Sequence, residues 1–236
     1  MIERTLVVNA DDFGQSPGVT RGIIEAHQRG IVTSASLMVL WPASTTAASY
    51  ARTRPELSVG LHIDLGEWTC LEGTWRCCYQ RVDLNDTRAV EHEVRGQLER
   101  CRDLLGGNPT HLDSHQHVHR KEPILSVLTS IANELGVPLR HVTPGIRYCG
   151  DFYGQTAAGN AMPDSISVAS LLWLLLSLPR GVTELGCHPG YAEDLDTVYK
   201  PERRVELRTL CAREVRATVA EEQIRLATFQ DLAAVR

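Results

Sequence analysis

Along the chain, segments whose hydrophobic positions are typical of strands alternate with segments whose hydrophobic positions are typical of helices. Short apolar runs rich in β-branched residues predict buried strands, and they alternate with longer segments in which apolar positions recur at helical spacing. The predicted strands are residues 5–10, 31–39, 57–63, 109–113, 139–142, 182–187 and 223–227. The predicted helices are residues 17–29, 43–54, 88–105, 122–135, 165–178 and 202–222. This alternation predicts parallel strands joined by helical crossovers, an α/β fold.

An open doubly wound sheet and a closed (β/α) barrel both agree with this order of elements. A barrel would place its functional polar residues at the carboxyl ends of several strands. Residues 64–87 show no clear period and are predicted to form a long loop, which in a compact domain is often functional. Because no low-complexity linker or strong shift in composition divides the sequence, we expect a single domain over residues 1–236.

The composition is typical of a soluble globular protein, with 236 residues, 43% hydrophobic and 22% charged, and a net charge of −5. It excludes a disordered chain, and the lack of a basic excess argues against a nucleic-acid partner. The 7 cysteines include no C-x-x-C pair, so we expect reduced thiols. Residues 168–178 are too short for a membrane span, and the first residues lack a signal-peptide pattern. We therefore expect a cytoplasmic protein.

Four predicted strands end in residues that could carry chemistry. Asp11 and Asp12 follow the first strand, and His62 lies at the end of the third. The fourth strand runs into a histidine-rich segment at 110–119, and His188 follows the strand at 182–187. A single histidine at a strand end is more often structural than a ligand, but four such positions favour one common rim. Asp11 and Asp12 would point in opposite directions on an extended chain, so one could bind a metal while the other faces water. A turn or helix cap is the alternative.

Four of the nine histidines lie within nine residues, at 111, 115, 117 and 119. Imidazole suits divalent transition metals, so the segment predicts a metal site. An extended segment would place all four on one face, whereas a helical one would pair His115 with His119. The spacing alone leaves open which of them is a ligand.

The segments 8–14 (VNADDFG), 60–62 (GLH), 110–119 (THLDSHQHVH) and 187–190 (CHPG) occur in this order. Together they resemble the YdjC/ChbG family of carbohydrate deacetylases, over most of the chain from residue 8 to about 191. The resemblance implies an irregular, TIM-like (β/α) barrel of about seven strands. It implies a hydrolase that removes an N-acetyl group from an amino-sugar substrate, such as a chitooligosaccharide, a glycolipid or a glycosylated metabolite.

The resemblance also implies roles for individual residues. Asp12, His62 and His115 match the ligands of one divalent metal ion, Asp11 matches the general base, and His188 matches the acid that protonates the leaving amine. Family practice names magnesium, whereas two imidazole ligands favour zinc or another transition metal.

Further residues are expected to bind the sugar. Arg140 matches a position at the substrate rim, and Asp113 and His117 belong to the histidine-rich motif without a settled role. Trp68 and Tyr148 lie in the two segments expected at the barrel mouth, where aromatic rings could stack on a sugar. These two segments match the family least and look short, which favours a small or exposed substrate.

Two other functions stay open on the residues alone. The same barrel could carry another metal-dependent hydrolase, such as a phosphoesterase, or a non-catalytic carbohydrate-binding protein. A possible partner is a second copy of the chain, because the helix predicted at 165–178 is apolar on nearly every side and could form a homodimer interface.

Overall fold

The structure is a computed structural model that describes residues 3–71 and 73–233. Its centre is β1 (Arg4–Phe13), whose residues are all buried except the first. The apolar, β-branched run at the start of β1 suits a strand that is covered on both faces. β1 pairs in parallel with β2 (Ser34–Leu37) on one side and with β8 (Gly181–Cys187) on the other.

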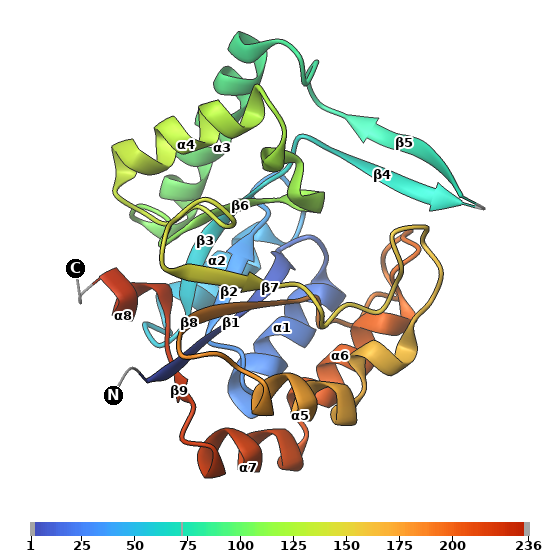
Figure 1. Ribbon diagram of the computed structural model, residues 1–236. Helices are drawn as coiled ribbons and strands as arrows, with labels where there is room; N and C mark the ends of the chain where they lie inside the picture. The colour runs from blue at the N-terminus through green and yellow to red at the C-terminus, as the bar shows by residue number, and fades with distance from the viewer. Residues whose placement is uncertain (1–2, 72, 234–236) are drawn as a thin grey trace.

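The main sheet is parallel and curled, with helices packed outside it (Figure 1). Its strand order is β6-β3-β2-β1-β8-β7, and the short β9 pairs with β1. The other strands of this sheet are β3 (Ser58–Ile63), β6 (Leu112–Ser114), β7 (Ile146–Cys149) and β9 (Arg225–Leu226). This path confirms the predicted α/β barrel-like fold of about seven strands, in an irregular form with β6 and β7 at the ends of the path.

The helices form two groups around the sheet. They are α1 (Pro17–Arg29), α2 (Ser44–Arg52), α3 (Thr87–Leu105), α4 (Ile124–Leu135), α5 (Val168–Leu176), α6 (Pro201–Leu210), α7 (Arg213–Glu221) and α8 (Phe229–Ala233). α3 packs between α2 and α4, while α1 packs on α6 and α5 on α7 (Figure 1). α1 begins as the sequence predicts, because the Ser16 side chain accepts a hydrogen bond from the Val19 N–H and Pro17 occupies the first turn.

The prediction of a loop at residues 64–87 is wrong for most of this segment. The chain there forms an antiparallel hairpin of β4 (Gly66–Leu71) and β5 (Thr74–Gln80) that projects from the barrel (Figure 1). Nearly all side chains of β5 are exposed. Because no face of this strand is buried in a core, its sequence lacks the alternation by which a strand is recognised.

Three other predicted elements differ. The helix predicted at 202–222 is two helices, α6 and α7, and the helix predicted at 165–178 is a short 3-10 turn (Pro163–Ile166) followed by α5. The strand predicted at 139–142 is reduced to a single bridge at Leu139, and β7 forms later instead. His141 has a left-handed φ of 65°, which turns the chain away from an extended course.

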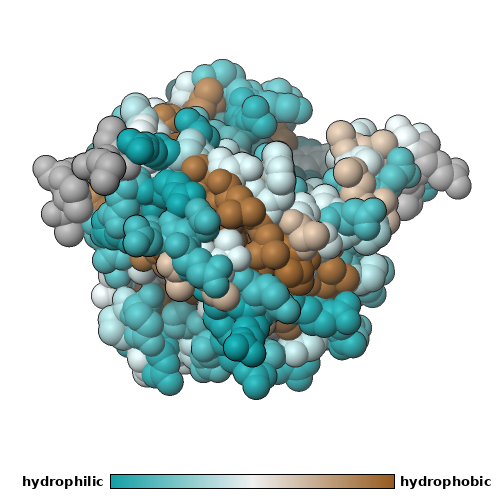
Figure 2. Space-filling view, turned by 60° about the horizontal axis from the view of Figure 1, so that its bottom comes forward, coloured by the Kyte–Doolittle hydropathy of each residue, from teal (hydrophilic) through white to brown (hydrophobic). Residues whose placement is uncertain are grey.

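α5 leaves part of its apolar surface uncovered. Trp173 is 66% exposed and Leu176 is 56% exposed. Figure 2, in which the bottom of Figure 1 comes forward, shows a band of hydrophobic residues across this face. In the part of the chain that the structure describes, no helix has the length and apolar character to cross a membrane.

Two glycines offer a matched test of how closely side chains pack around β3. A Cβ at Gly60 in β3 would lie 2.5 Å from the His111 imidazole, which itself stacks on Phe229 with ring centroids 3.9 Å apart. Gly60→Ala should therefore lower the free energy of unfolding by about 1–3 kcal/mol. Gly96 lies inside α3 with nothing within 4 Å of its added Cβ, so Gly96→Ala should raise that free energy by about 0.5–1 kcal/mol. Urea unfolding of both variants measures this, and a Gly60→Ala variant as stable as the parent would contradict the packing.

Candidate functional site

The two adjacent carboxylates at the end of β1, Asp11 and Asp12, contact different partners. The register of β1 against β2 shifts between Ala10 and Phe13, and Asp12 has a left-handed φ of 68°. Asp11 and Asp12 are both buried, with 2% and 1% of their surface exposed. The irregular backbone lets Asp11 and Asp12 serve two different groups of side chains.

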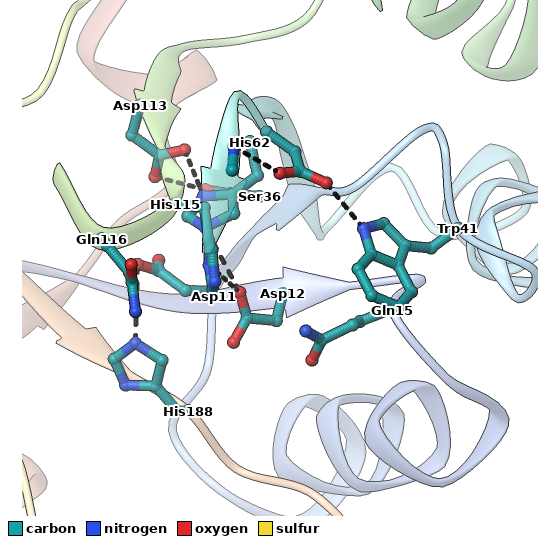
Figure 3. A network of polar contacts seen from close by, with 12 residues as sticks. Asp11, Asp12, Gln15, Ser36, Trp41, His62, Asp113, His115, Gln116 and His188 are labelled. Carbon is teal, nitrogen blue, oxygen red and sulfur yellow. Dashed lines mark hydrogen bonds and ion pairs between the residues drawn. The ribbon is translucent and has the colours of Figure 1, made fainter. Parts of the chain in front are cut away.

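Asp12 meets two imidazoles at the carboxyl ends of neighbouring strands (Figure 3). Its Oδ1 lies 3.3 Å from His62 Nε2 and 3.1 Å from His115 Nδ1. His62 ends β3, and His115 follows β6 directly, so the parallel sheet brings both to one edge. One potential ligand atom from each of the three residues lies within 4.8 Å of the other two.

This cluster fits a divalent metal ion. One carboxylate and two imidazoles are a donor set of catalytic metal sites, which keep positions open for water or substrate. His115 Nε2 is buried and has no hydrogen-bond partner among the described residues. A buried imidazole nitrogen without a partner is costly unless a ligand satisfies it. The structure thus assembles the three residues that the sequence predicts as metal ligands.

The charges of the cluster favour a cation. Burial opposes the ionisation of Asp12, but Arg203 and His115 hold the pKa of this carboxyl well below its usual value. Burial would lower the pKa of His62, but the Asp113 carboxylate raises it well above its usual value. Asp12 raises the pKa of His115 in the same way, against its burial. The pocket therefore attracts protons, and a metal ion would compete with them.

Asp113 orients His62 from behind. His62 Nδ1 lies 2.7 Å from Asp113 Oδ1, and the Ser36 hydroxyl donates to Asp113 Oδ2 at 2.6 Å. A carboxylate on the second nitrogen of a metal-binding histidine fixes its tautomer and ring orientation. Asp113 is fully buried and supports His62, and a contact of Asp113 with substrate stays a prediction.

Arg140 lies beneath the carboxylates rather than at the rim. Its guanidinium makes two hydrogen bonds to Asp11, at 2.7 and 2.8 Å, and further ones to Asp113 at 2.8 Å and Glu184 at 2.7 Å. Only 4% of Arg140 is exposed, so the expected place at the substrate rim is corrected to a buried one. Asp11, His62 and Asp113 also lie close enough together to hold a cation, but the Arg140 guanidinium already supplies the positive charge there.

Asp11 and His188 lie near each other in the site and differ in their charge states. Burial opposes the ionisation of Asp11, but the Arg140 guanidinium lowers the pKa of this carboxyl. His188 Nε2 lies 3.9 Å from Asp11 Oδ2, and burial lowers the pKa of this imidazole to about 4. At neutral pH Asp11 is therefore an anion and His188 is uncharged.

The remaining predicted residues lie around this centre at different depths. Trp68, His117 and Tyr148 are all half-buried, and the Tyr148 hydroxyl lies 3.3 Å from His117 Nε2. The Arg140 guanidinium carbon lies 4.8 Å from the centre of the Tyr148 ring. All three side chains are partly exposed. Their role toward a sugar stays a prediction.

Two other histidines of the motif are structural. His111 packs between Ser36 and Phe229, and His119 binds the Ser114 hydroxyl at 2.6 Å and the Arg140 carbonyl at 3.1 Å. Burial lowers the pKa of both imidazoles to about 4, which keeps them neutral. Of the four candidate histidines of the motif, His115 is the one that lies in the cluster with Asp12 and His62.

Helix α6 supplies residues that sequence reasoning missed. Arg203 Nη2 donates to Asp12 Oδ2 at 2.6 Å, and Glu206 accepts hydrogen bonds from the His188 N–H and the Tyr199 hydroxyl. Both residues are buried. Their signal in the sequence is weak, because α6 carries charged residues on most of its surface and only the fold shows which of them point inward.

Comparisons with known proteins identify the family of the chain. Residues 5–221 match the family model described as YdjC-like protein. A chitooligosaccharide deacetylase of Klebsiella pneumoniae is 32% identical, covering 98% of this chain and 100% of its own. A carbohydrate deacetylase of Brevibacillus brevis is also 32% identical, covering 96% and 99%.

Solved structures share the fold. A putative cellobiose-phosphate cleavage protein of Enterococcus faecalis superposes with a TM-score of 0.77 at 28% identity, covering 98% of this chain and 99% of its own. A family 4 carbohydrate esterase of Streptomyces lividans, solved with acetate, gives a TM-score of 0.50 at 11% identity, covering 97% and 93%. The second likeness concerns the fold alone.

The buried Glu206 predicts a pH dependence of stability. Burial raises the pKa of its carboxyl from 4.5 to about 8. Between these pH values the folded protein holds a proton that the unfolded chain releases, so the free energy of unfolding falls as the pH rises. Glu206→Gln keeps a neutral acceptor and should make this slope less steep, by up to about 1.4 kcal/mol per pH unit. Urea unfolding of both proteins from pH 5 to pH 8 tests this, and parallel curves would rule it out.

Proposed function

Because the chain belongs to the YdjC-like protein family, we propose that it is a metal-dependent carbohydrate N-deacetylase. The proposed reaction is the hydrolysis of an acetamide on an amino sugar, which consumes water and gives acetate and a free amine. The observation that carries this proposal is the meeting of Asp12, His62 and His115 within 4.8 Å, beside the separate carboxylate of Asp11. The relatives that are named deacetylases support the substrate class.

Asp12, His62 and His115 would hold one divalent ion. When bound, such an ion supplies Lewis-acid chemistry, which polarises a carbonyl and makes water more acidic. Two imidazole nitrogens favour zinc or another transition metal, whereas magnesium prefers oxygen ligands. The identity of the ion thus stays a prediction between zinc and magnesium.

Asp11 is proposed as the general base. It is ionised, and Arg140 holds both of its oxygens, while Asn9 Nδ2 donates to Oδ1 at 2.8 Å. Held in this way, the carboxylate can take a proton from the attacking water without changing its position. A base fixed in hydrogen-bonding reach of its proton contributes more than one that must be ordered first.

His188 is proposed as the acid that protonates the leaving amine. Because this imidazole is neutral in the free protein, it must gain a proton during the reaction. Its Nε2 lies 3.9 Å from Asp11 Oδ2, so the proton that Asp11 takes from water has a short path to it. Protonation of the amine then lets the carbon–nitrogen bond break and leaves acetate.

The sugar is proposed to lie near Trp68, His117 and Tyr148, which are half-buried side chains of three different segments. Aromatic rings stack on the apolar faces of sugars, and His117 and Tyr148 can also form hydrogen bonds. A homodimer through the apolar face of α5 and a cytoplasmic location both stay predictions.

The first test of this function is acetate release from N-acetylated mono- and oligosaccharides in the presence of a divalent metal ion. Asp11→Asn should lower the rate by about 10²–10⁴-fold, because the base is lost. The variant should still bind the metal, since Asp11 is not among the proposed ligands.

Equal rates for Asp11→Asn and the parent protein would reject the base assignment. Turnover of phosphate esters without acetate release would favour the phosphoesterase. Binding of sugars without turnover of either substrate would favour a carbohydrate-binding protein.

The ion pair between Arg203 and Asp12 leads to a second prediction, which concerns metal affinity. This ion pair holds Asp12 Oδ2 at 2.6 Å and leaves Oδ1 toward the imidazoles. Arg203→Met should weaken divalent metal binding by about 10–100-fold, because the carboxylate loses the partner that orients it. Arg204→Met is the matched control, since Arg204 is exposed and pairs with the exposed Glu193. Titration against a chelating dye measures both, and equal affinities for the two variants would show that Arg203 does not orient Asp12.

A further inference from the structure

The β4–β5 hairpin is attached to the barrel mainly at its base. Asp64 accepts hydrogen bonds there from the Tyr79 hydroxyl at 2.9 Å, from Arg81 Nη2 at 2.8 Å and from the Gly66 N–H at 3.2 Å. Beyond the base the two strands pair with each other and project outward (Figure 1). β4 is partly covered there, because Cys70 is buried and a Cβ at Gly159 would lie 2.7 Å from the Cys70 carbonyl oxygen. A two-stranded hairpin is marginally stable in water by itself. Its position therefore depends on the contacts that reach it from the body.

One side chain from the candidate metal centre reaches the middle of β4. Gln116 Oε1 accepts the Trp68 N–H at 2.9 Å, and Gln116 Nε2 donates to the Trp68 carbonyl at 2.7 Å. The amide thus occupies both backbone groups of Trp68, as a neighbouring strand would. Among the residues that the structure describes, these are the hydrogen bonds that join residues 68–78 to the rest of the chain.

Gln116 directly follows His115, and the backbone there turns sharply. Gln116 has φ 51° and ψ 24°, and His117 has φ 53° and ψ 31°. A left-handed backbone costs about 1–2 kcal/mol for each residue with a side chain, so it persists only where other contacts fix it. The turn lets His115 point to Asp12 while Gln116 reaches the hairpin. A shift of either residue along this turn would displace the other.

We propose that Gln116 is a positioning residue that couples the β4–β5 hairpin to His115, so that cation binding and hairpin docking favour each other. This inference rests on the proposed metal site but not on deacetylation. Coupling is reciprocal: the factor by which a bound cation favours the docked hairpin equals the factor by which the docked hairpin raises cation affinity. Docking also fixes Trp68, one of the residues proposed to contact the sugar.

Limited proteolysis measures this coupling without any sugar. Arg76 is an exposed residue of β5, and trypsin cuts after it only when the hairpin opens. In the parent protein, a saturating zinc concentration should slow the cut after Arg76 by about fivefold or more. In Gln116→Ala this protection should disappear, and zinc affinity should fall by the same factor.

Two variants sharpen the result. Gln116→Glu keeps an acceptor for the Trp68 N–H but loses the donor to its carbonyl, so its zinc protection should be smaller than that of the parent. Gln80→Ala is the control, because Gln80 is an exposed residue of the same hairpin whose amide donates to Val82 and not to the body near His115. Its protection should equal that of the parent.

Equal zinc protection in Gln116→Ala and the parent would overturn the coupling while leaving the metal site intact. Failure of the parent to bind zinc, magnesium or cobalt would overturn the metal site and the coupling together. Absence of acetate release, with zinc protection that depends on Gln116, would overturn only the proposed reaction.

Discussion

The backbone at the end of β1 separates the tasks of two adjacent carboxylates. In a regular strand Asp11 and Asp12 would point to opposite faces of the sheet and could not share one site. The register shift after Ala10 and the left-handed φ of 68° at Asp12 bring both toward the carboxyl edge. Asp11 then reaches Arg140, whereas Asp12 reaches His62 and His115. The strained conformation is fixed by these partners, so geometry and charge of the site depend on each other.

The charges explain why two arginines are buried here. Asp11, Asp12 and Asp113 are all held as anions in the interior, which is costly unless cations compensate them. Arg140 contacts Asp11, Asp113 and the buried Glu184, whereas Arg203 contacts Asp12. The other oxygen of Asp12 is directed to His62 and His115, whose pKa values are raised by neighbouring carboxylates. A divalent cation could bind at that point without displacing either arginine.

The sequence predicts the residues that could carry chemistry better than it predicts the residues that hold them in place. Residues at the ends of parallel strands converge because the sheet brings these ends together, so their places after apolar runs predict one common rim. The choice of Asp12, His62 and His115 as ligands rests on the resemblance to the family, because spacing alone leaves open which histidine of the motif binds a metal. Arg203 and Glu206 could not be predicted, because a helix that is charged on most sides does not reveal which residues face inward. The β4–β5 hairpin could not be predicted for a different reason: β5 has no buried face, so its sequence carries no alternation of apolar and polar residues. The sequence places Arg140 at the rim and the structure places it in the interior, because a single sequence does not show that three carboxylates surround it.

Asp11 and His188 are also held in different protonation states at the same pH. Asp11 and His188 lie 3.9 Å apart, yet Arg140 keeps Asp11 ionised and burial keeps His188 neutral. Neutral His188 cannot act as the acid at the start, so in the proposed reaction Asp11 first takes a proton from water, and that transfer supplies the proton that the imidazole then donates. In this arrangement Arg140 does more than neutralise charge, because it decides which of the two groups acts first.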